Sequence, residues 1–268
     1  MAASLALLTR SQGAHIRDLL LDKRVRARDS AFVVEGAHAV RDLLIRYPDQ
    51  ILMIVVARGY LPKEGGSDRL VRLASSTPQY SCPDPQFSKL SDLDKPQGIL
   101  AVVRQPAWDE ESLLKQSTVL GIYGEQIQDP TNVGTIIRTG AALNASALWL
   151  TPESADAFHP KVVRASSGTV LALPIFAAKD VSGLIRQGCQ VFAAEVTGDG
   201  AVPIDKIHQV PRKLVLAFGN ESRGLSAQIR RQANARFTIP LSRDVESLNV
   251  AATVAIATFH FSRLPKGE

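Results

Sequence analysis

Short apolar runs alternate along the chain with longer stretches of helical periodicity. Runs such as Ile51–Ala57 and Lys213–Phe218 are almost entirely apolar, as expected of strands buried on both faces. Stretches such as Ala37–Ile45 carry apolar residues three and four positions apart, which predicts helices with one buried side. Alternating strands and helices are typical of an α/β fold whose mostly parallel sheet is covered on both faces.

The pattern places these elements at definite residues. The expected strands are Phe32–Val34, Ile51–Ala57, Ile99–Val103, Thr118–Tyr123, Ala147–Leu150, Gln190–Val196, Lys213–Phe218 and Phe237–Pro240. The expected helices are Ala14–Leu21, Ala37–Ile45, Arg69–Ala74, Phe87–Leu93, Gly134–Leu143, Lys161–Ser167, Val181–Arg186, Ala227–Gln232 and Leu248–Phe261.

One stretch lacks a long apolar segment. Residues 105–116 contain Pro106 and a charged run, and we expect them to link a smaller domain of residues 1–104 to a larger one of residues 117–268. The charged run could instead cap a helix that continues through Leu113 and Leu114.

Composition narrows the class of protein. The chain has 268 residues, 45% of them hydrophobic, enough for one large core or two smaller ones. Its two cysteines have no metal-ligand spacing, so we expect neither a zinc site nor disulfides, no other bound metal, and a reduced, cytoplasmic protein. No apolar run approaches the roughly 20 residues of a transmembrane helix, so we expect no membrane partner.

Positive charge gathers in the first part of the chain. The net charge is +5, and residues 1–108 hold 15 basic and 11 acidic side chains against 16 and 15 in residues 109–268. A clustered basic excess attracts polyanions, although solvated lysine-rich and arginine-rich helices have similar counts.

Three loops that follow strands hold most of the polar residues of interest. In open α/β sheets, ligands bind beyond the carboxyl ends of strands, which here are residues 124–133, 219–225 and 241–247. Several familiar motifs are absent: the chain has no GxGxxG, no HExxH and no GxSxG. The spacing Gly219–Gly224 resembles a P-loop but lacks the lysine that contacts phosphate.

Each loop also has a purely structural interpretation. Asn132 could simply cap the helix that carries Arg138, because a short polar side chain there satisfies free backbone N–H groups. Glu221, flanked by Gly219 and Gly224, could be a solvated acid in a strand-to-helix turn. Asn249 is unusual in the first turn of an apolar helix, which Ser247 or Glu246 could cap, and if buried it must be hydrogen-bonded.

Together the three loops resemble the signature motifs of the SpoU (TrmH-like) RNA ribose 2′-O-methyltransferases of the SPOUT superfamily. The similarity lies in Asn132-Val-Gly134 with Arg138, in Gly219-Asn-Glu221 with Gly224, and in Ile239-Pro-Leu241 followed by Glu246-Ser-Leu-Asn-Val250. The segment Asp156–Gly168 and residues 1–104 also resemble parts of the family, the latter an L30e-like substrate-binding domain.

This resemblance implies a fold and a chemistry that periodicity does not reach. The fold would be an α/β methyltransferase domain with a carboxyl-terminal trefoil knot, preceded by the smaller L30e-like α/β domain. S-adenosylmethionine would be the methyl donor, RNA the substrate, and the protein a homodimer whose active site lies near the subunit interface.

Residue roles follow from the same resemblance. The catalytic positions would be Asn132, Arg138, Glu221 and Asn249. The cofactor-binding positions would be Ala217, Phe218, Gly219, Asn220, Ile239, Leu241, Ser247 and Leu248. The basic residues expected to bind RNA are Arg10, Lys23, Arg24, Arg26, Arg28, Lys161 and Arg164. Thr139-Gly140 and Ala217-Phe218 depart from the usual family residues, so the pocket wall is expected to differ there.

The expected mechanism depends on Arg138. The family gives this position the proton-accepting role, but a guanidinium group is protonated and has no acceptor. We therefore expect Arg138 to hold the phosphate of the target nucleotide by a paired hydrogen bond, and Asn132 to orient Arg138 or the ribose.

The extra amino-terminal domain favours large-subunit (23S) ribosomal RNA as substrate. Three alternatives remain open: a tRNA ribose methyltransferase of the same family, an rRNA enzyme that confers antibiotic resistance, and a catalytically silent RNA-binding or ribosome-assembly protein. The four polar motif residues argue against the silent protein.

Overall fold

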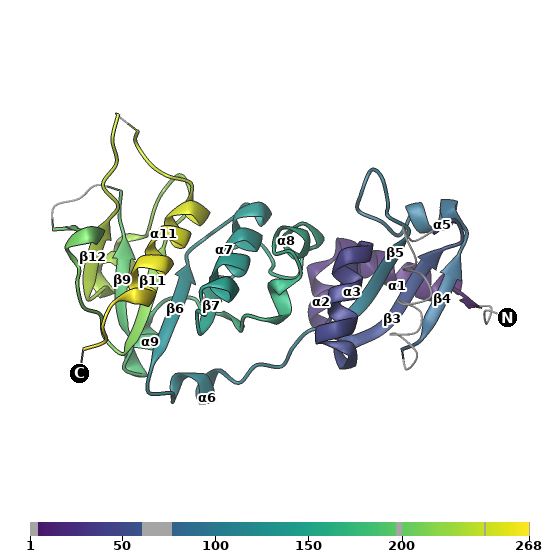
Figure 1. Cartoon of the computed structure of the whole chain (residues 1–268), viewed down its shortest axis with the longest axis horizontal. Helices are drawn as coiled ribbons and strands as arrows, with labels where there is room; N and C mark the ends of the chain where they lie inside the picture. Colours follow the sequence, from purple (N-terminus) through teal and green to yellow (C-terminus); the bar gives the residue numbers. More distant parts are fainter. Residues whose placement is uncertain (1–4, 61–76, 197–199, 244, 268) are drawn as a thin grey trace. The chain divides into compact units, whose positions relative to one another are not determined.

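The computed structural model describes residues 5–60, 77–196, 200–243 and 245–267. The chain divides into two compact units, one formed by Met1–Pro106 with Phe158–Gly168 and the other by Ala107–Ala157 with Thr169–Glu268. Figure 1 shows the helices and strands of both. The expected helix Arg69–Ala74 lies outside the described residues.

Unit 1 is built on a mixed five-stranded sheet in the order β1-β4-β3-β5-β2. Strand β5 pairs antiparallel with β2 and β3, while β4 pairs parallel with β3 and β1. The strands are β1 (Ala6–Leu7), β2 (Ala31–Glu35), β3 (Ile51–Ala57), β4 (Gln79–Cys82) and β5 (Ile99–Arg104). The helices are α1 (Arg10–Leu21), α2 (Lys23–Asp29), α3 (Ala37–Arg46), α5 (Asp84–Ser88) and α8 (Pro160–Ala165).

Three helices of unit 1 differ clearly from the expected ones. Helix α1 begins at Arg10, four residues before the expected start at Ala14, because Thr9 caps it. The basic stretch after Leu21 forms α2, because Asp22 starts a new helix by accepting a hydrogen bond from the Arg24 backbone. The helix expected at Phe87–Leu93 is α5, which begins three residues earlier and ends at Ser88. Its Phe87 is buried in the core of this unit beside Ile16 and Leu100.

Unit 2 is built on a parallel seven-stranded sheet in the order β10-β12-β9-β11-β6-β7-β8. Its strands are β6 (Val119–Gly124), β7 (Ala147–Leu150), β8 (Ile175–Ala177), β9 (Gln190–Ala194), β10 (Val202–Pro203), β11 (Lys213–Phe218) and β12 (Ala235–Thr238). Its helices are α6 (Glu110–Leu114), α7 (Pro130–Ala142), α9 (Ser182–Arg186), α10 (Ala227–Gln232) and α11 (Val250–Arg263). The expected α/β fold with a parallel sheet is confirmed.

The period-two alternation of the strands gives this sheet two buried faces. On one face, Val215 and Ala217 of β11 pack in a cluster with Leu113, Leu184 and Ile229 from α6, α9 and α10. On the other, Phe261 of α11 lies against Phe192 and Phe237. Helices α7 and α11, which pack against each other, cover this second face.

The unit boundaries differ from the expected division in two places. Within residues 105–116, the helix α6 is capped by Asp109, and its Leu113 and Leu114 are buried in unit 2. Glu110 also accepts a 2.6 Å hydrogen bond from the Trp149 indole. Residues 158–168 group with unit 1, where Phe158 contacts the Phe32 ring at 4.9 Å.

Both cysteines are buried free thiols. Burial raises the pKa of Cys82 and of Cys189. Among the described helices, none is both long and apolar enough to span a membrane.

Candidate active site

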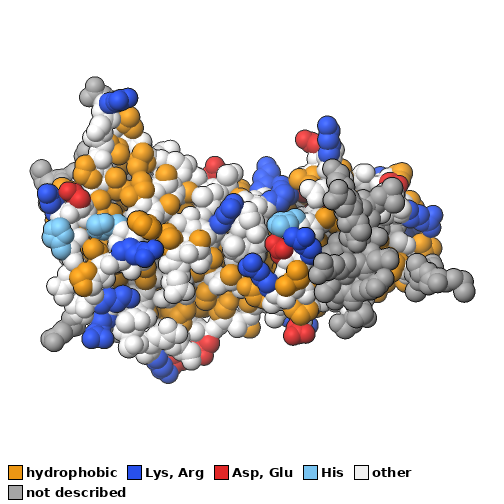
Figure 2. Space-filling model, in the orientation of Figure 1, with side chains coloured by type: hydrophobic (Ala, Val, Ile, Leu, Met, Phe, Trp, Pro, Cys, Tyr) orange, Lys and Arg blue, Asp and Glu red, His pale blue; other side chains and the backbone are white. Residues whose placement is uncertain are grey.

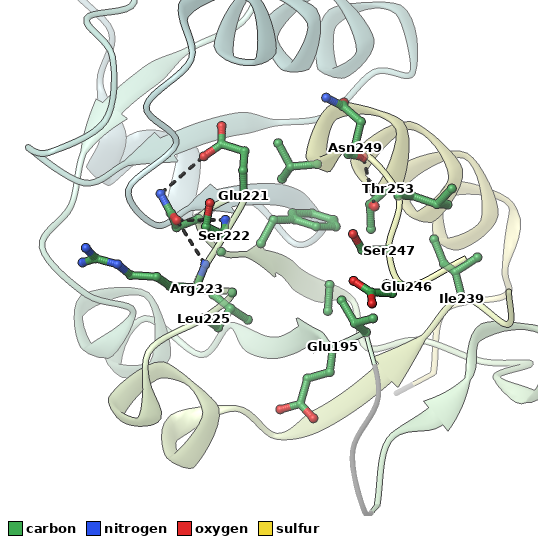
Figure 3. A pocket seen from close by; sticks show the side chains of 18 of the residues that line it. Glu195, Glu221, Ser222, Arg223, Leu225, Ile239, Glu246, Ser247, Asn249 and Thr253 are labelled. Carbon is green, nitrogen blue, oxygen red and sulfur yellow. Dashed lines mark hydrogen bonds between the residues drawn. The ribbon is translucent and has the colours of Figure 1, made fainter. Parts of the chain in front are cut away.

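A pocket of about 550 Å³ opens at the carboxyl ends of β9, β11 and β12, where the sequence places two of its three polar loops. Figure 3 shows its wall, with Asn249 and Thr253 at the start of α11, Ile239 to one side and Glu195 at the opposite end. Of the expected cofactor-binding residues, the structure places these in the wall: Phe218, Gly219, Asn220, Ile239, Leu241, Ser247 and Leu248.

Ala217 is the exception. It is fully buried in the core cluster of the sheet face covered by α6, α9 and α10, and it is not among the described residues that line the pocket. The cause is strand geometry, because successive side chains of a strand point to opposite faces. Phe218 faces the pocket, so Ala217 points away from it.

The loop after β11 closes on itself so tightly that only glycine fits at its first position. A Cβ atom on Gly219 would lie 2.0 Å from the carbonyl carbon of Gly224 and 2.2 Å from the nitrogen of Leu225. Gly224 has a positive φ of 66°, a conformation that side chains rarely adopt. The amide oxygen of Asn220 accepts hydrogen bonds from the backbone N–H groups of Ser222 and Arg223 at 3.0 and 3.1 Å.

Three of the four predicted catalytic residues form one hydrogen-bonded chain. Asn132 donates to Oε1 of Glu221 at 2.9 Å, and Asn249 donates to Oδ1 of Asn132 at 2.9 Å. We call this chain, Glu221–Asn132–Asn249, the amide relay. The two groups at the ends of the relay determine which way each amide side chain is turned. The Glu221 carboxylate only accepts hydrogen bonds, and the backbone N–H groups bound by Asn249 only donate them. The relay ties together loops that lie far apart in the sequence.

The helix caps differ from those expected. Asp129, rather than Asn132, caps α7 by accepting from the Thr131 backbone at 2.8 Å. Asn249, rather than Ser247 or Glu246, caps α11 by accepting from Ala251 and Ala252. Asn132 is therefore a buried residue in the first turn of α7, and its side chain is available for the relay.

Two residues at the end of β6 also hold the site together, and the sequence analysis did not single them out. The backbone oxygen of Gln126 accepts from the Asn220 amide at 2.9 Å, and Gln126 has a positive φ of 54°. The buried carboxylate of Glu125 accepts from the Ser226 backbone at 2.7 Å. Their position directly after a buried strand was the available signal.

The fourth predicted catalytic residue, Arg138, lies on α7. It is an exposed residue of α7, and it is not among the described residues that line the pocket. Six positions separate it from Asn132, so the two side chains leave the helix about 120° apart. The expectation that Asn132 orients Arg138 or the ribose stays a prediction.

The basic residues expected to bind RNA fall into distinct environments in unit 1. Arg26 is buried, 2% exposed, and its guanidinium donates to the backbone oxygens of Leu19 and Leu20 at 2.6 and 3.2 Å. This position makes Arg26 a structural residue, and the prediction that it contacts RNA was wrong. Burial was not visible in the sequence because Arg26 lies among exposed basic neighbours.

The remaining basic residues keep exposed or partly exposed side chains. Arg24 pairs with Asp22, Arg28 pairs with Asp29, and Arg164 pairs with Asp92 at 2.8 Å. Arg10, Lys23 and Lys161 are exposed. Figure 2 shows Lys and Arg side chains spread over the visible face rather than collected into one patch.

Two family models match the chain. The SpoU rRNA methylase family matches residues 120–259, and the MRM3-like substrate binding domain matches residues 15–101.

Among the described residues, no group of three or more His, Cys, Asp or Glu side chains could hold a metal ion.

Similar proteins extend over nearly the whole chain. The 23S rRNA (guanosine(2553)-2′-O)-methyltransferase RlmP of Bacillus subtilis is 30% identical over 242 residues, 89% of this chain and 91% of the relative. An AdoMet-bound rRNA methyltransferase from Sinorhizobium meliloti is 28% identical with a TM-score of 0.79, covering 97% of this chain and 96% of that one. The SpoU methyltransferase AviRb from Streptomyces viridochromogenes shares the fold, with a TM-score of 0.82 at 23% identity, over 95% and 98% of the two chains.

Proposed function

The chain belongs to the SpoU rRNA methylase family, and we propose that it methylates a ribose 2′-hydroxyl of large-subunit ribosomal RNA with S-adenosylmethionine as the donor. The observation that carries this proposal is the pocket at the carboxyl ends of β9, β11 and β12, bounded by the loops that the amide relay holds together.

The pocket fits the donor by its chemistry. Adenine is recognised by backbone N–H and C=O groups within an apolar slot. Gly219, Ile239 and Leu248 line the pocket, and Phe218 and Leu225 add apolar residues to its wall. Its volume of about 550 Å³ lies within the range of roughly 300–1,000 Å³ for small-molecule sites.

The amide relay makes the site rigid. Glu221 also accepts from the Asn220 side chain at 3.3 Å, so its carboxylate is held by two amides. A carboxylate held in this way fixes the loop around Gly219, while Asn249 fixes the start of α11. In this proposal Asn132, Glu221 and Asn249 position the loops that hold donor and ribose, and pre-organised geometry supplies much of the rate.

S-adenosylmethionine supplies a methyl group made electrophilic by its sulfonium. The protein must orient the ribose and give the hydroxyl proton a route away. We assign Arg138 to the phosphate of the target nucleotide, since its planar fork matches two phosphate oxygens. Held there, its positive charge stabilises the developing 2′-oxyanion, and the phosphate is the group that takes the proton.

A homodimer is part of the proposal. Ile256 and Phe259 of α11 are 42% and 53% exposed, and they lie three positions apart, on the same side of the helix. Figure 2 shows hydrophobic side chains gathered where Figure 1 draws α11 and the segment before it. A second copy that covers this face would bring α7, the helix that packs on α11 and carries Arg138, close to the interface. Sedimentation equilibrium of wild type and Phe259→Asp tests this, with dimer and monomer expected respectively.

The choice of ribosomal RNA rests on unit 1 and on the relative RlmP. The test is to incubate the protein with methyl-labelled S-adenosylmethionine and total RNA from cells lacking it, and then to separate the RNA by size. Label in large-subunit rRNA is the expected result. Label confined to tRNA would overturn the assignment of substrate, and donor binding without label in any RNA would favour a silent RNA-binding protein.

A further inference from the structure

A second hollow in unit 2 is lined mainly by arginine. It has a volume of about 480 Å³, and its wall consists of Ala227, Arg230, Arg231, Ala233 and Arg236. Three of these five lining residues are arginines. We call this space the arginine hollow. None of its residues was among the basic residues that the sequence analysis assigned to RNA.

The helix that carries two of these arginines is fixed on several sides. Ile229 of α10 is buried, 1% exposed, in the core of the sheet. The side chain of Gln232 donates to Ser182 at 2.8 Å, and that of Gln228 donates to Asp180 at 3.3 Å. Ser226, which caps α10, is in turn held by Glu125. Arg230 and Arg231 are thus exposed on a helix that has little freedom to move.

Two of the three arginines have no ion-pair partner among the described residues. Within the described part of the chain, neither Arg230 nor Arg231 has a carboxylate within ion-pair distance, whereas Arg236 lies 3.7 Å from Glu195. Like charges held close together repel one another and are stabilised by an anion between them. The guanidinium fork, moreover, matches a phosphate group with two parallel hydrogen bonds.

The hollow adjoins the candidate active site. Arg230 lines both the hollow and the large pocket, and Glu195, the partner of Arg236, lines the large pocket as well. Arg223 also lies in the pocket wall, and Figure 3 shows its side chain pointing away from Glu246 and Ser247. An RNA strand whose ribose enters the pocket would therefore carry its neighbouring phosphates past exposed arginines.

We propose that the arginine hollow binds backbone phosphate of the substrate RNA next to the nucleotide that is methylated. This inference rests on the proposed function and adds to it a phosphate-binding subsite on the methyltransferase unit itself. Phosphate contacts of this kind add affinity and set the register of the strand, without reading its sequence.

The test is the salt dependence of RNA binding. Affinity of the full-length protein for a fluorescein-labelled RNA hairpin is measured by anisotropy between about 50 and 200 mM KCl, where each phosphate contact contributes roughly 0.7–0.9 to the slope of log K against log salt. Arg231→Gln should lower the slope by about one contact, and Arg230→Gln with Arg231→Gln by one to two contacts. Weaker binding of about three- to tenfold is expected for Arg231→Gln at the lower salt concentration.

A matched control is Arg186→Gln. Arg186 is also an exposed arginine in the last turn of a short helix. It precedes the amino-terminal end of β9, whereas the pocket lies at the carboxyl end of that strand. Its slope should equal that of wild type. Equal slopes for wild type, Arg231→Gln and the double variant would overturn the proposal, as would an equal loss in Arg186→Gln.

Donor binding separates this proposal from the proposed function. Arg231 does not line the large pocket as far as the described residues show, so Arg231→Gln should bind S-adenosylmethionine like wild type in calorimetry. A reduced RNA slope with unchanged donor affinity supports the subsite. If wild type bound no donor and methylated no RNA, the proposed function would fail, and the RNA slopes would still decide whether the hollow binds phosphate.

Discussion

The side chain of Asn249 donates a 2.9 Å hydrogen bond to the amide oxygen of Asn132, 117 positions earlier in the chain. Asn132 passes the connection on to Glu221. Each amide uses one end as donor and the other as acceptor, so neither can turn around without placing two donors or two acceptors against each other. The side chain of Asn132, which takes part in both bonds, therefore links the loop around Glu221 to the start of α11.

Replacing Asn132 should break the relay at its centre. Asn132→Asp places a carboxylate against that of Glu221, and we expect unfolding free energy to fall by about 1–3 kcal/mol and methyl transfer to fall at least tenfold. Urea denaturation and single-turnover methylation measure the two effects. Gln128→Ala, at an exposed position just before α7, is the control and should change neither. Wild-type turnover in Asn132→Asp would show that methyl transfer does not need the relay.

Gly219→Ala should abolish the pocket. The added Cβ atom would lie 2.0 Å from the Gly224 backbone, far inside contact distance. Because the atoms that it meets are backbone atoms, the loop would have to open to make room for it. We expect loss of donor binding in calorimetry, together with a lower melting temperature. Gly183→Ala is the matched control, because the nearest atom to its added Cβ is the end of the Arg186 side chain at 3.9 Å. Normal donor affinity in Gly219→Ala would contradict the closed loop.

Variants of Arg24 and Arg26 should differ in their free energy of unfolding. Arg26→Ala leaves buried carbonyls of Leu19 and Leu20 without their donor, at a cost of about 1–3 kcal/mol for such a group. Arg24 has a side chain 91% exposed, and an exposed ion pair contributes at most about 1 kcal/mol. Guanidinium denaturation should thus show a large loss for Arg26→Ala alone. Equal losses in both variants would refute the structural role of Arg26.

The partly buried carboxyl group of Glu35 should make the stability of the protein depend on pH. Burial raises its pKa, against the opposing effect of the Ser91 hydroxyl, which donates to both oxygens at 2.7 and 2.8 Å. A carboxyl group with a raised pKa in the folded state contributes stability that is present below its unfolded pKa and is lost as pH rises through the folded pKa. The stability of wild type relative to Glu35→Gln should therefore fall as pH rises from about 4 to 7. Thermal melts at a series of pH values measure it, and a rise would contradict the burial of Glu35.

Arg138 variants test the paired hydrogen bond to phosphate. Arg138→Ala should lower kcat by about 100-fold or more, the loss typical for one group that stabilises developing charge. Arg138→Lys keeps the charge but loses the planar fork, and it should recover only part of the activity. Steady-state kinetics with rRNA decide between the roles: full activity in Arg138→Lys would exclude a need for the fork, and full activity in Arg138→Ala would exclude the residue from catalysis.

Much of the fold follows from the sequence because its strands are strongly apolar. Ile51–Ala57, Ala147–Leu150 and Lys213–Phe218 have the expected bounds, as does the helix Ala227–Gln232. Helix starts were less accurate, since capping depends on which of several nearby polar residues faces the free N–H groups. Asp129 and Asn249 take that role, where Asn132 and Ser247 or Glu246 were expected.

The site was harder to predict than the fold for a similar reason. The motif residues lie in loops that follow strands, so their gathering around one pocket could be expected, and Phe218, Gly219 and Leu248 line it. The sequence does not reveal which face of a strand a side chain occupies when both faces are buried, and Ala217 was misplaced for that reason. Nor does a run of basic residues show which member is turned inward, as Arg26 is.

The expected acceptor of the methyl group is a ribose oxygen. This expectation is tested by digesting RNA methylated with labelled S-adenosylmethionine in alkali and separating the products. A 2′-O-methyl group blocks attack on the neighbouring phosphate, so label is expected in an alkali-stable dinucleotide, and at least tenfold less of it with Asn132→Asp. Label in a mononucleotide would mean a methylated base and would contradict methylation of the ribose.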